Sequence, residues 1–272
     1  MGIDELTLMF NRAWQQTFLK PKLFLVSLHL FVCGLLVIFF RSLAVHAGPW
    51  MVKSMTFLPI FLSSGILLSM GVLLIRIYHD EVKQRSIQYK ETLKKSWDTV
   101  IGTSYIFIPV ILCYLILWML SGLFYLLGEL PLLGEMFQTI LVFGPFLLNL
   151  GSLLLCVLSL MLLFLVTPVV ALKSASKEQI ASLVLERIRA CVFTNICLLL
   201  LALVPFILAG GLLVGAAILT TTSEIMVSSV LRVSVEWFFM MIPFTALLSP
   251  AVIFFFNLAA ESHVFMQKRL RV

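Results

Sequence analysis

Long apolar segments alternate with short polar ones along the chain, and their lengths predict helices that cross a membrane. A helix needs about 20 mostly apolar residues to span the hydrocarbon core of a bilayer. Six segments meet this length, at residues 23–43, 57–77, 105–127, 149–172, 193–219 and 237–260. We therefore predict an all-α fold, a polytopic transmembrane helical bundle of six spans that forms a single integral membrane domain.

Polar segments precede the first, third and fifth spans, and we predict that they form amphipathic helices outside the lipid. They cover residues 3–19, 78–100 and 174–190. In the first, apolar residues such as Met9 and Ala13 recur at helical spacing. The other two contain many good helix formers, so we expect helix there as well.

The stretch from Met136 to Leu172 has an ambiguous length. It is too long for one upright span and too short for two full spans joined by a turn. Gly144-Pro145 offers a natural break, since proline interrupts helical hydrogen bonding. We predict a short segment at residues 136–148, separate from the span at 149–172. Whether that segment is re-entrant or interfacial stays open.

Composition excludes a soluble globular protein. Of the 272 residues, 61% are of the apolar types and 12% are charged, and the mean hydropathy is +1.12. A soluble domain has about 45–50% apolar and about 25% charged residues. A disordered chain and a nucleic-acid binder with a basic surface are excluded on the same ground.

The basic residues predict the orientation. Sixteen of the 19 Lys and Arg residues fall beside the termini and in or directly beside the two long polar segments, and the other three are Arg41, Lys53 and Arg232. Cytoplasmic loops carry the excess of Lys and Arg, so both termini are expected in the cytoplasm. The clusters there would meet anionic headgroups. The chain has no Asn-x-Ser/Thr glycosylation acceptor, which fits a bacterial cytoplasmic (inner) membrane.

Ionisable side chains are scarce inside the predicted spans. No Asp, Glu, Lys or Arg lies well away from a span end, which weakens an ion-coupled transporter and an acid–base intramembrane enzyme. No nucleotide-binding, hydrolase or zinc-protease motif occurs, and the five cysteines include no Cys-x-x-Cys pair. We therefore predict no catalytic residue, no metal and no cofactor.

A few polar residues within or beside the spans are the candidate intramembrane positions. His29 could be a relay or a ligand, or a neutral histidine bonded to a neighbouring helix. The asparagines could form one polar spot or could cap and cross-link helices separately. The candidates are His29, Asn149, Asn195, Thr245 and Asn257.

Two small-residue pairs are candidates for close helix packing. Gly211 and Gly215 form a Gly-x-x-x-Gly motif, and Gly65 and Ser69 form a related pair. Small residues four positions apart allow two helix backbones to approach each other in a membrane.

Each third of the chain has the same layout of a polar helix, a span, an outer turn and a returning span. The polar helices end in Ala13-Trp14, Ser96-Trp97 and Ala190-Cys191. This suggests three parallel helix-hairpin repeats. The alternative is that any six-span protein with cytoplasmic polar segments has this layout.

The layout resembles a group of bacterial six-span proteins related to the membrane domain of some glycerophosphodiester phosphodiesterases. The resemblance lies in Arg76-Ile-Tyr-His-Asp80, followed by a polar helix with Ser86 and Lys94-Lys95-Ser96-Trp97, and in a second such helix from Lys173 through Glu186 to Cys191. It implies a six-span membrane fold. The catalytic domain is not part of the resemblance, so no phosphodiesterase activity follows.

Two functions from different classes remain. The first is a non-catalytic integral protein that scaffolds, assembles with membrane-protein partners or with itself, or organises lipid. The second is a transporter or permease subunit for an uncharged or amphiphilic solute. A midplane cavity lined by Asn195, Asn257 or Thr245 would favour transport, whereas a solid bundle with lipid-facing grooves would favour the first.

Overall fold

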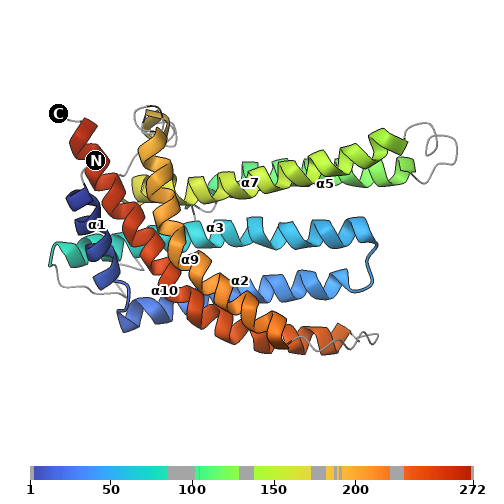
Figure 1. Ribbon diagram of the computed structural model, residues 1–272, viewed down its shortest axis with the longest axis horizontal. Coiled ribbons are helices and arrows are strands. Elements are labelled where there is room, and N and C mark those ends of the chain that lie inside the picture. Colours follow the sequence, from blue (N-terminus) through green and yellow to red (C-terminus); the bar gives the residue numbers. More distant parts are fainter. Residues whose placement is uncertain are drawn as a thin grey trace.

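The computed structural model describes residues 3–84, 102–103, 105–128, 138–172, 182–186, 189, 192–220 and 230–270. Helices make up its named elements (Figure 1). They are α1 (Ile3–Gln15), α2 (Lys20–Ala44), α3 (Pro49–Val82), the short 3-10 helix η1 (Tyr105–Phe107), α5 (Ile108–Gly128), α7 (Gln138–Leu172), α9 (Val192–Thr220) and α10 (Val230–Leu270).

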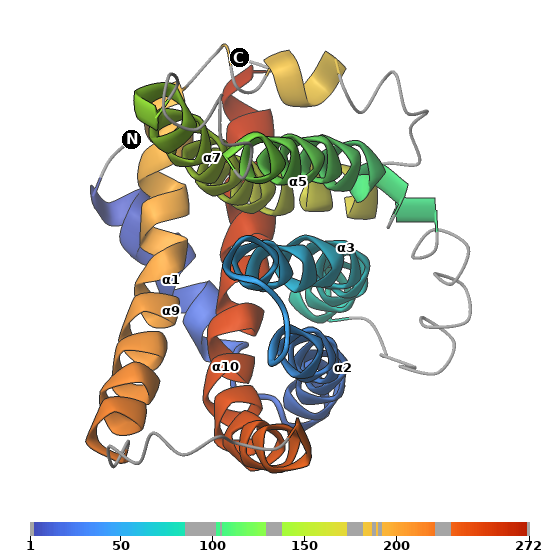
Figure 2. The same cartoon turned by 90° about the vertical axis from the view of Figure 1, so that its right-hand side faces the viewer.

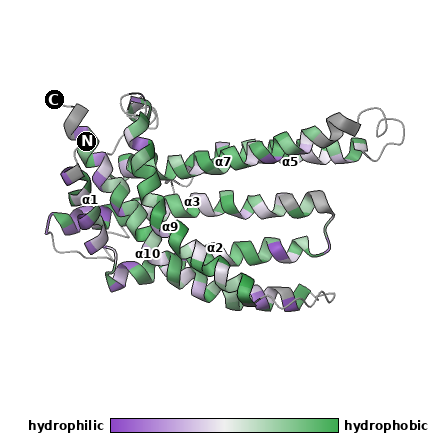
Figure 3. Ribbon diagram, in the orientation of Figure 1, coloured by the Kyte–Doolittle hydropathy of each residue, from purple (hydrophilic) through white to green (hydrophobic). Residues whose placement is uncertain are grey.

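Within these described ranges, six helices are long and apolar enough to cross a membrane: α2, α3, α5 with η1, α7, α9 and α10. This confirms the predicted all-α class and the six spans as a helical bundle. Figure 3 shows hydrophobic residues along most of each long helix, with more hydrophilic residues at the end of the bundle where the chain termini lie than at the opposite end.

Helix α7 differs from the prediction because it runs unbroken through Gly144-Pro145. Residues 138–148 are therefore the first turns of the span and not a separate segment, while 136 and 137 lie outside the described residues. The missing amide of Pro145 removes one helical hydrogen bond, which a long helix tolerates in a membrane. At 35 residues, α7 is about 50 Å long at the usual helical rise.

Two other helices extend past the predicted spans. Helix α3 includes residues 78–82, which were assigned to a polar segment, and α10 begins at Val230 and ends at Leu270. Polar helix formers continue a helix after the apolar stretch ends, so hydropathy alone places these ends too early. Residues 85–101 and most of 174–190 lie outside the described part of the chain.

The six long helices form three hairpins, α2–α3, α5–α7 and α9–α10. Both chain termini lie at one end of the bundle, which we call the inner end (Figure 1). The turn at residues 45–48 lies at the opposite end, called the outer end, as do Gly128 and Gln138 at the facing ends of α5 and α7. A protein with an even number of spans has this arrangement.

The returning helices of the three hairpins, α3, α7 and α10, pack on one another and form the core (Figure 2). Residues Ala251–Ala260 of α10 and Leu163–Ala171 of α7 are buried without interruption. Between these two helices the rings of Phe255 and Phe164 meet edge to face at 5.6 Å. These stretches belong to the inner half of the bundle.

The first helix of each hairpin packs on the outside of this core. Helix α2 packs against α3 and α10, α5 packs against α7 and α3, and α9 packs against α10. Helices α2 and α5 each contact two of the core helices, as repeats would, whereas α9 is in contact mainly with its own hairpin partner. Two of the three proposed anchor pairs, at residues 96–97 and 190–191, lie outside the described residues, so repeat ancestry stays a hypothesis.

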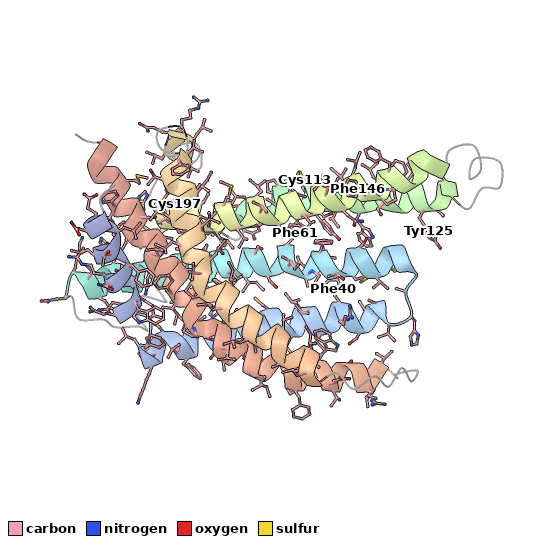
Figure 4. All side chains as sticks on the ribbon, in the orientation of Figure 1. Phe40, Phe61, Cys113, Tyr125, Phe146 and Cys197 are labelled. Carbon is pink, nitrogen blue, oxygen red and sulfur yellow. The ribbon has the colours of Figure 1, made fainter. Side chains whose placement is uncertain are left out.

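Apolar side chains cover the exposed surfaces of α5, α7 and α9, which face away from the core. Phe146 on α7 is 58% exposed, and Cys113 and Cys197 are exposed on α5 and α9 (Figure 4). By contrast, Phe61 is fully buried between α3 and α5, with its ring centroid 4.8 Å from that of Tyr114. In a bilayer, lipid tails solvate such exposed apolar surfaces.

Candidate functional site

A buried ion pair joins α2 to α3 at the inner end. The Lys22 ammonium at the start of α2 donates a hydrogen bond to Glu81 Oε2 in the last turn of α3. Their side chains are 0% and 7% exposed. A charge removed from solvent is tolerated when an opposite charge compensates it. The pair therefore fixes the inner ends of two consecutive helices against each other.

Tyr78 connects this ion pair to α10. Its ring centroid is 5.4 Å from the Lys22 ammonium, within the range of cation–π attraction. Its hydroxyl donates a 2.6 Å hydrogen bond to Glu261 Oε1 on α10. We call Lys22, Tyr78, Glu81 and Glu261 the inner polar cluster. It links three helices of the bundle.

Sequence reasoning missed this cluster. Neither Lys22 nor Glu81 is among the candidate positions predicted from the sequence, yet both side chains are buried and paired. The pairing joins residues 59 positions apart, which hydropathy does not reveal. The available signal was that Lys22 and Glu81 flank consecutive antiparallel spans at the same end, where opposite charges can meet.

Asn257 holds the amphipathic helix α1 on the bundle. The side chain is fully buried, and its Nδ2 donates to the carbonyl oxygen of Ala13 at 3.2 Å. Thr17 Oγ1 donates to the same carbonyl at 2.8 Å. The rings of Phe10 and Phe254 meet beside this contact with centroids 5.1 Å apart. This candidate intramembrane residue therefore links two helices.

The other candidate polar residues lie on different helices. His29 Nδ1 bonds to the carbonyl of Leu25, one turn earlier in α2, at 2.8 Å. Thr245 Oγ1 donates to Ile242 O at 2.9 Å and lines a groove between α2 and α10. Asn195 is buried near the start of α9. None of these contacts joins two candidates.

Asn149 lines a small cavity of about 20 Å³ between α3, α5 and α7. Nearby, the Tyr114 hydroxyl donates a 2.5 Å hydrogen bond to the carbonyl of Ser54, which joins α5 to α3. Asn149 is on the outer half of α7, whereas Asn257 is on the inner half of α10. The structure does not bring the two amides into one polar spot.

The candidate packing pairs have different surroundings. Gly65 is buried in α3, and Ser69 Oγ donates to its carbonyl at 3.2 Å. A Cβ placed at Gly211 or Gly215 would meet no atom within 4 Å of the described structure, so these two glycines do not pack against another helix of this chain. The close approaches lie at glycines that form no such motif, including Gly34 and Gly71.

In the described ranges, no three His, Cys, Asp or Glu side chains are grouped so that they could hold a metal ion. Arg76, part of the motif that carried the family resemblance, donates from Nε to the carbonyl of Ala171 at 3.1 Å. That bond ties α3 to α7 at the inner end.

Searches of protein-family models, curated proteins and solved structures find no match to this chain. The fold itself defines the class. With six helices that are long and apolar enough to cross a membrane in the described residues, the chain is an all-α, multi-pass membrane protein.

Proposed function

We propose that this protein is a non-catalytic component of a bacterial cytoplasmic membrane, with a scaffolding, assembly or lipid-organising role. In this proposal both termini and the polar segments lie in the cytoplasm, because most of the Lys and Arg residues gather there. The resemblance in layout to six-span bacterial membrane proteins supports the same placement.

The observation that carries this proposal is what the buried polar groups of the inner half do. Lys22 bonds to Glu81, Tyr78 to Glu261, and Asn257 to the backbone of α1. Each bond joins two different helices. A pathway for a solute needs polar groups that face a shared space, whereas these groups are used to hold helices together.

The apolar groove between α2 and α10 also favours the scaffold over the transporter. Its lining comes from two neighbouring helices, α2 and α10, so it is a groove along a helix seam and not a chamber on the bundle axis. Thr245, one of the residues whose position would indicate transport, lines this groove beside apolar side chains. This placement suits contact with lipid or a partner helix more than passage of a solute.

The proposal is tested by purifying the full chain in native lipid particles and identifying the retained proteins and lipids by mass spectrometry. We expect a stoichiometric membrane-protein partner, a second copy of the chain, or an enriched lipid class. Retention of bulk membrane lipid alone, with a monomeric protein, would contradict the proposal.

Transport is tested in proteoliposomes with two probes, glycerol for an uncharged solute and a fluorescent phosphatidylethanolamine for an amphiphile. We expect glycerol entry and lipid exchange between leaflets at the rates of protein-free vesicles. A protein-dependent acceleration that Thr245→Val abolishes would replace the scaffold proposal with the transporter.

A further inference from the structure

A groove of about 260 Å³ lies along the seam between α2 and α10 in the outer half of the bundle. Its walls are almost wholly apolar. They are formed by Leu30, Cys33, Gly34, Val37 and Ile38 of α2, and by Trp237, Met240, Met241, Phe244, Thr245 and Leu248 of α10.

Two contacts set how closely α2 and α10 approach each other along this groove. At Gly34 a Cβ would overlap the Met241 side chain, so the glycine lets Met241 lie directly against α2. Toward the outer end, Ser42 Oγ and Ser234 Oγ are hydrogen-bonded at 2.7 Å and hold the two helices together. The groove lies along the seam between α2 and α10 inward of this serine pair.

The dimensions suit a single alkyl chain. The volume is below the roughly 300–1,000 Å³ of sites for drug-sized ligands. Apolar walls with a single hydroxyl group, that of Thr245, offer little to a polar solute, and the Thr245 hydroxyl already bonds within its own helix.

Positive charge is placed at the outer end of the same groove. The Arg41 guanidinium lies 5.3 Å from the ring centroid of Trp237, which is itself a wall of the groove. Arg41 is exposed. Arg232 lies in the first turn of α10, toward the same end.

This placement matters because cations are rare on the outer side. Arg41, Lys53 and Arg232 are the three Lys and Arg residues that the sequence places there. Two of them belong to the two helices that line the groove, and the third belongs to α3, which does not line it. The groove therefore has apolar walls within the membrane and a cation at the membrane surface. A phospholipid has the matching arrangement, with its acyl chain inside the membrane and its phosphate at the surface.

We propose that the α2–α10 groove binds one phospholipid of the leaflet at the outer end. One acyl chain lies between Val37 and Phe244, and the phosphate bonds to the Arg41 guanidinium, which Trp237 holds in place. Arginine suits this role because its planar fork can give two hydrogen bonds to a phosphate. The site goes beyond the proposed function and holds whether or not the protein is a scaffold.

Native mass spectrometry of the delipidated full chain in detergent tests the site with two added lipids. The lipids are a phosphatidylglycerol and a diacylglycerol with the same acyl chains, which differ in the headgroup. We expect one phosphatidylglycerol to bind tightly and the diacylglycerol to bind about tenfold more weakly, the factor that corresponds to one lost charge-assisted contact.

Charge variants separate the site from general attraction of anionic lipid. Arg41→Gln should weaken phosphatidylglycerol binding about tenfold and leave diacylglycerol binding unchanged. Lys53→Gln is the matched control, since it removes the same charge at the same end from α3. Equal effects of the two variants, or equal affinity of the wild-type chain for both lipids, would overturn the proposal.

Groove-filling variants test where the acyl chain lies. Val37→Phe and Thr245→Phe fill the groove from opposite walls, and each should abolish binding of both lipids. Size-exclusion chromatography checks that each variant stays folded. If one variant does not fold, the other variant and the Arg41→Gln comparison still test the lipid site. Loss of dimer ions with unchanged lipid binding would identify the occupant as a second copy and refute the lipid site.

Discussion

Ten consecutive residues of α10, Ala251–Ala260, are buried in the inner half of the bundle, whereas nearer the outer end of the same helix Phe239 is 65% exposed and Ile242 is 49% exposed. Composition does not separate the two regions, since both are strongly apolar. The difference is in what surrounds them: the inner stretch contacts α1, α3, α7 and α9, and the outer stretch lies along α2.

The contrast shows what holds helices together when lipid replaces water. Lipid tails solvate an exposed leucine as well as another helix does, so apolar surface alone does not drive packing. The inner half adds links between helices, such as the Lys22–Glu81 ion pair and the Asn257–Ala13 hydrogen bond. The outer half keeps open faces and a groove, where lipid or a partner can bind.

The largest effect is expected from breaking the buried ion pair. Lys22→Met leaves the Glu81 carboxylate buried without its cation and should lower the free energy of unfolding by about 3–5 kcal/mol. Thermal unfolding in detergent micelles measures the change. Lys20→Met is the matched control, because Lys20 is exposed two residues away on the same helix end.

The double variant Lys22→Met with Glu81→Leu sharpens this result. Replacing both charges by apolar side chains of similar size should recover most of the lost stability, since a buried ion pair often contributes little net stability. A double variant as unstable as Lys22→Met would show that the cluster contributes through more than charge compensation.

A pair of glycine substitutions compares the packed and open surfaces with the same change. A Cβ at Gly71 would overlap the buried ring of Phe256, whereas one at Gly211 would meet nothing. Gly71→Ala should destabilise the protein by about 1–3 kcal/mol through overpacking. Gly211→Ala should be neutral or should stabilise by up to about 1 kcal/mol through helix propensity. Thermal unfolding in detergent micelles measures both variants. Equal losses of stability would contradict the difference between the packed surface at Gly71 and the open surface at Gly211.

The smallest effect concerns two polar residues within the spans. Asn257→Leu removes the bond to α1 and should cost about 1 kcal/mol, the usual size of a hydrogen bond between helices in a membrane. Limited proteolysis should then release α1 faster than in the wild-type chain. Thr245→Val should change stability by less than about 0.5 kcal/mol, because its hydroxyl bonds within its own helix. Unchanged proteolysis of Asn257→Leu would refute the role given to this side chain.

The helices were predictable because hydropathy and length act locally along the chain. The continuity of α7 was not, since Gly144-Pro145 resembles a break. In the structure, a Cβ at Gly144 would lie 2.7 Å from the Phe124 ring of α5, so this glycine provides space for a neighbouring helix and does not end its own. That use depends on a partner helix that one segment cannot reveal.

The same limit applies to the candidate sites. The Gly211–Gly215 motif predicted packing, yet the glycines that receive a neighbouring side chain lie outside it. Among them are Gly34 and Gly71, whose partners Met241 and Phe256 both come from α10. The inner polar cluster likewise joins residues from three helices. Sequence patterns identify which side chains are polar or small, whereas tertiary packing decides which of them meet.

Cysteine labelling of intact cells is the most direct test of the bundle's six crossings and its orientation. In a chain whose five native cysteines are replaced, His46→Cys lies in the turn between α2 and α3, and Lys83→Cys follows the inner end of α3. Both positions are exposed. A membrane-impermeant maleimide should label His46→Cys in intact cells and should label Lys83→Cys only after the membrane is opened. Labelling of Lys83→Cys from outside, with His46→Cys protected, would contradict the orientation on which the proposed function depends.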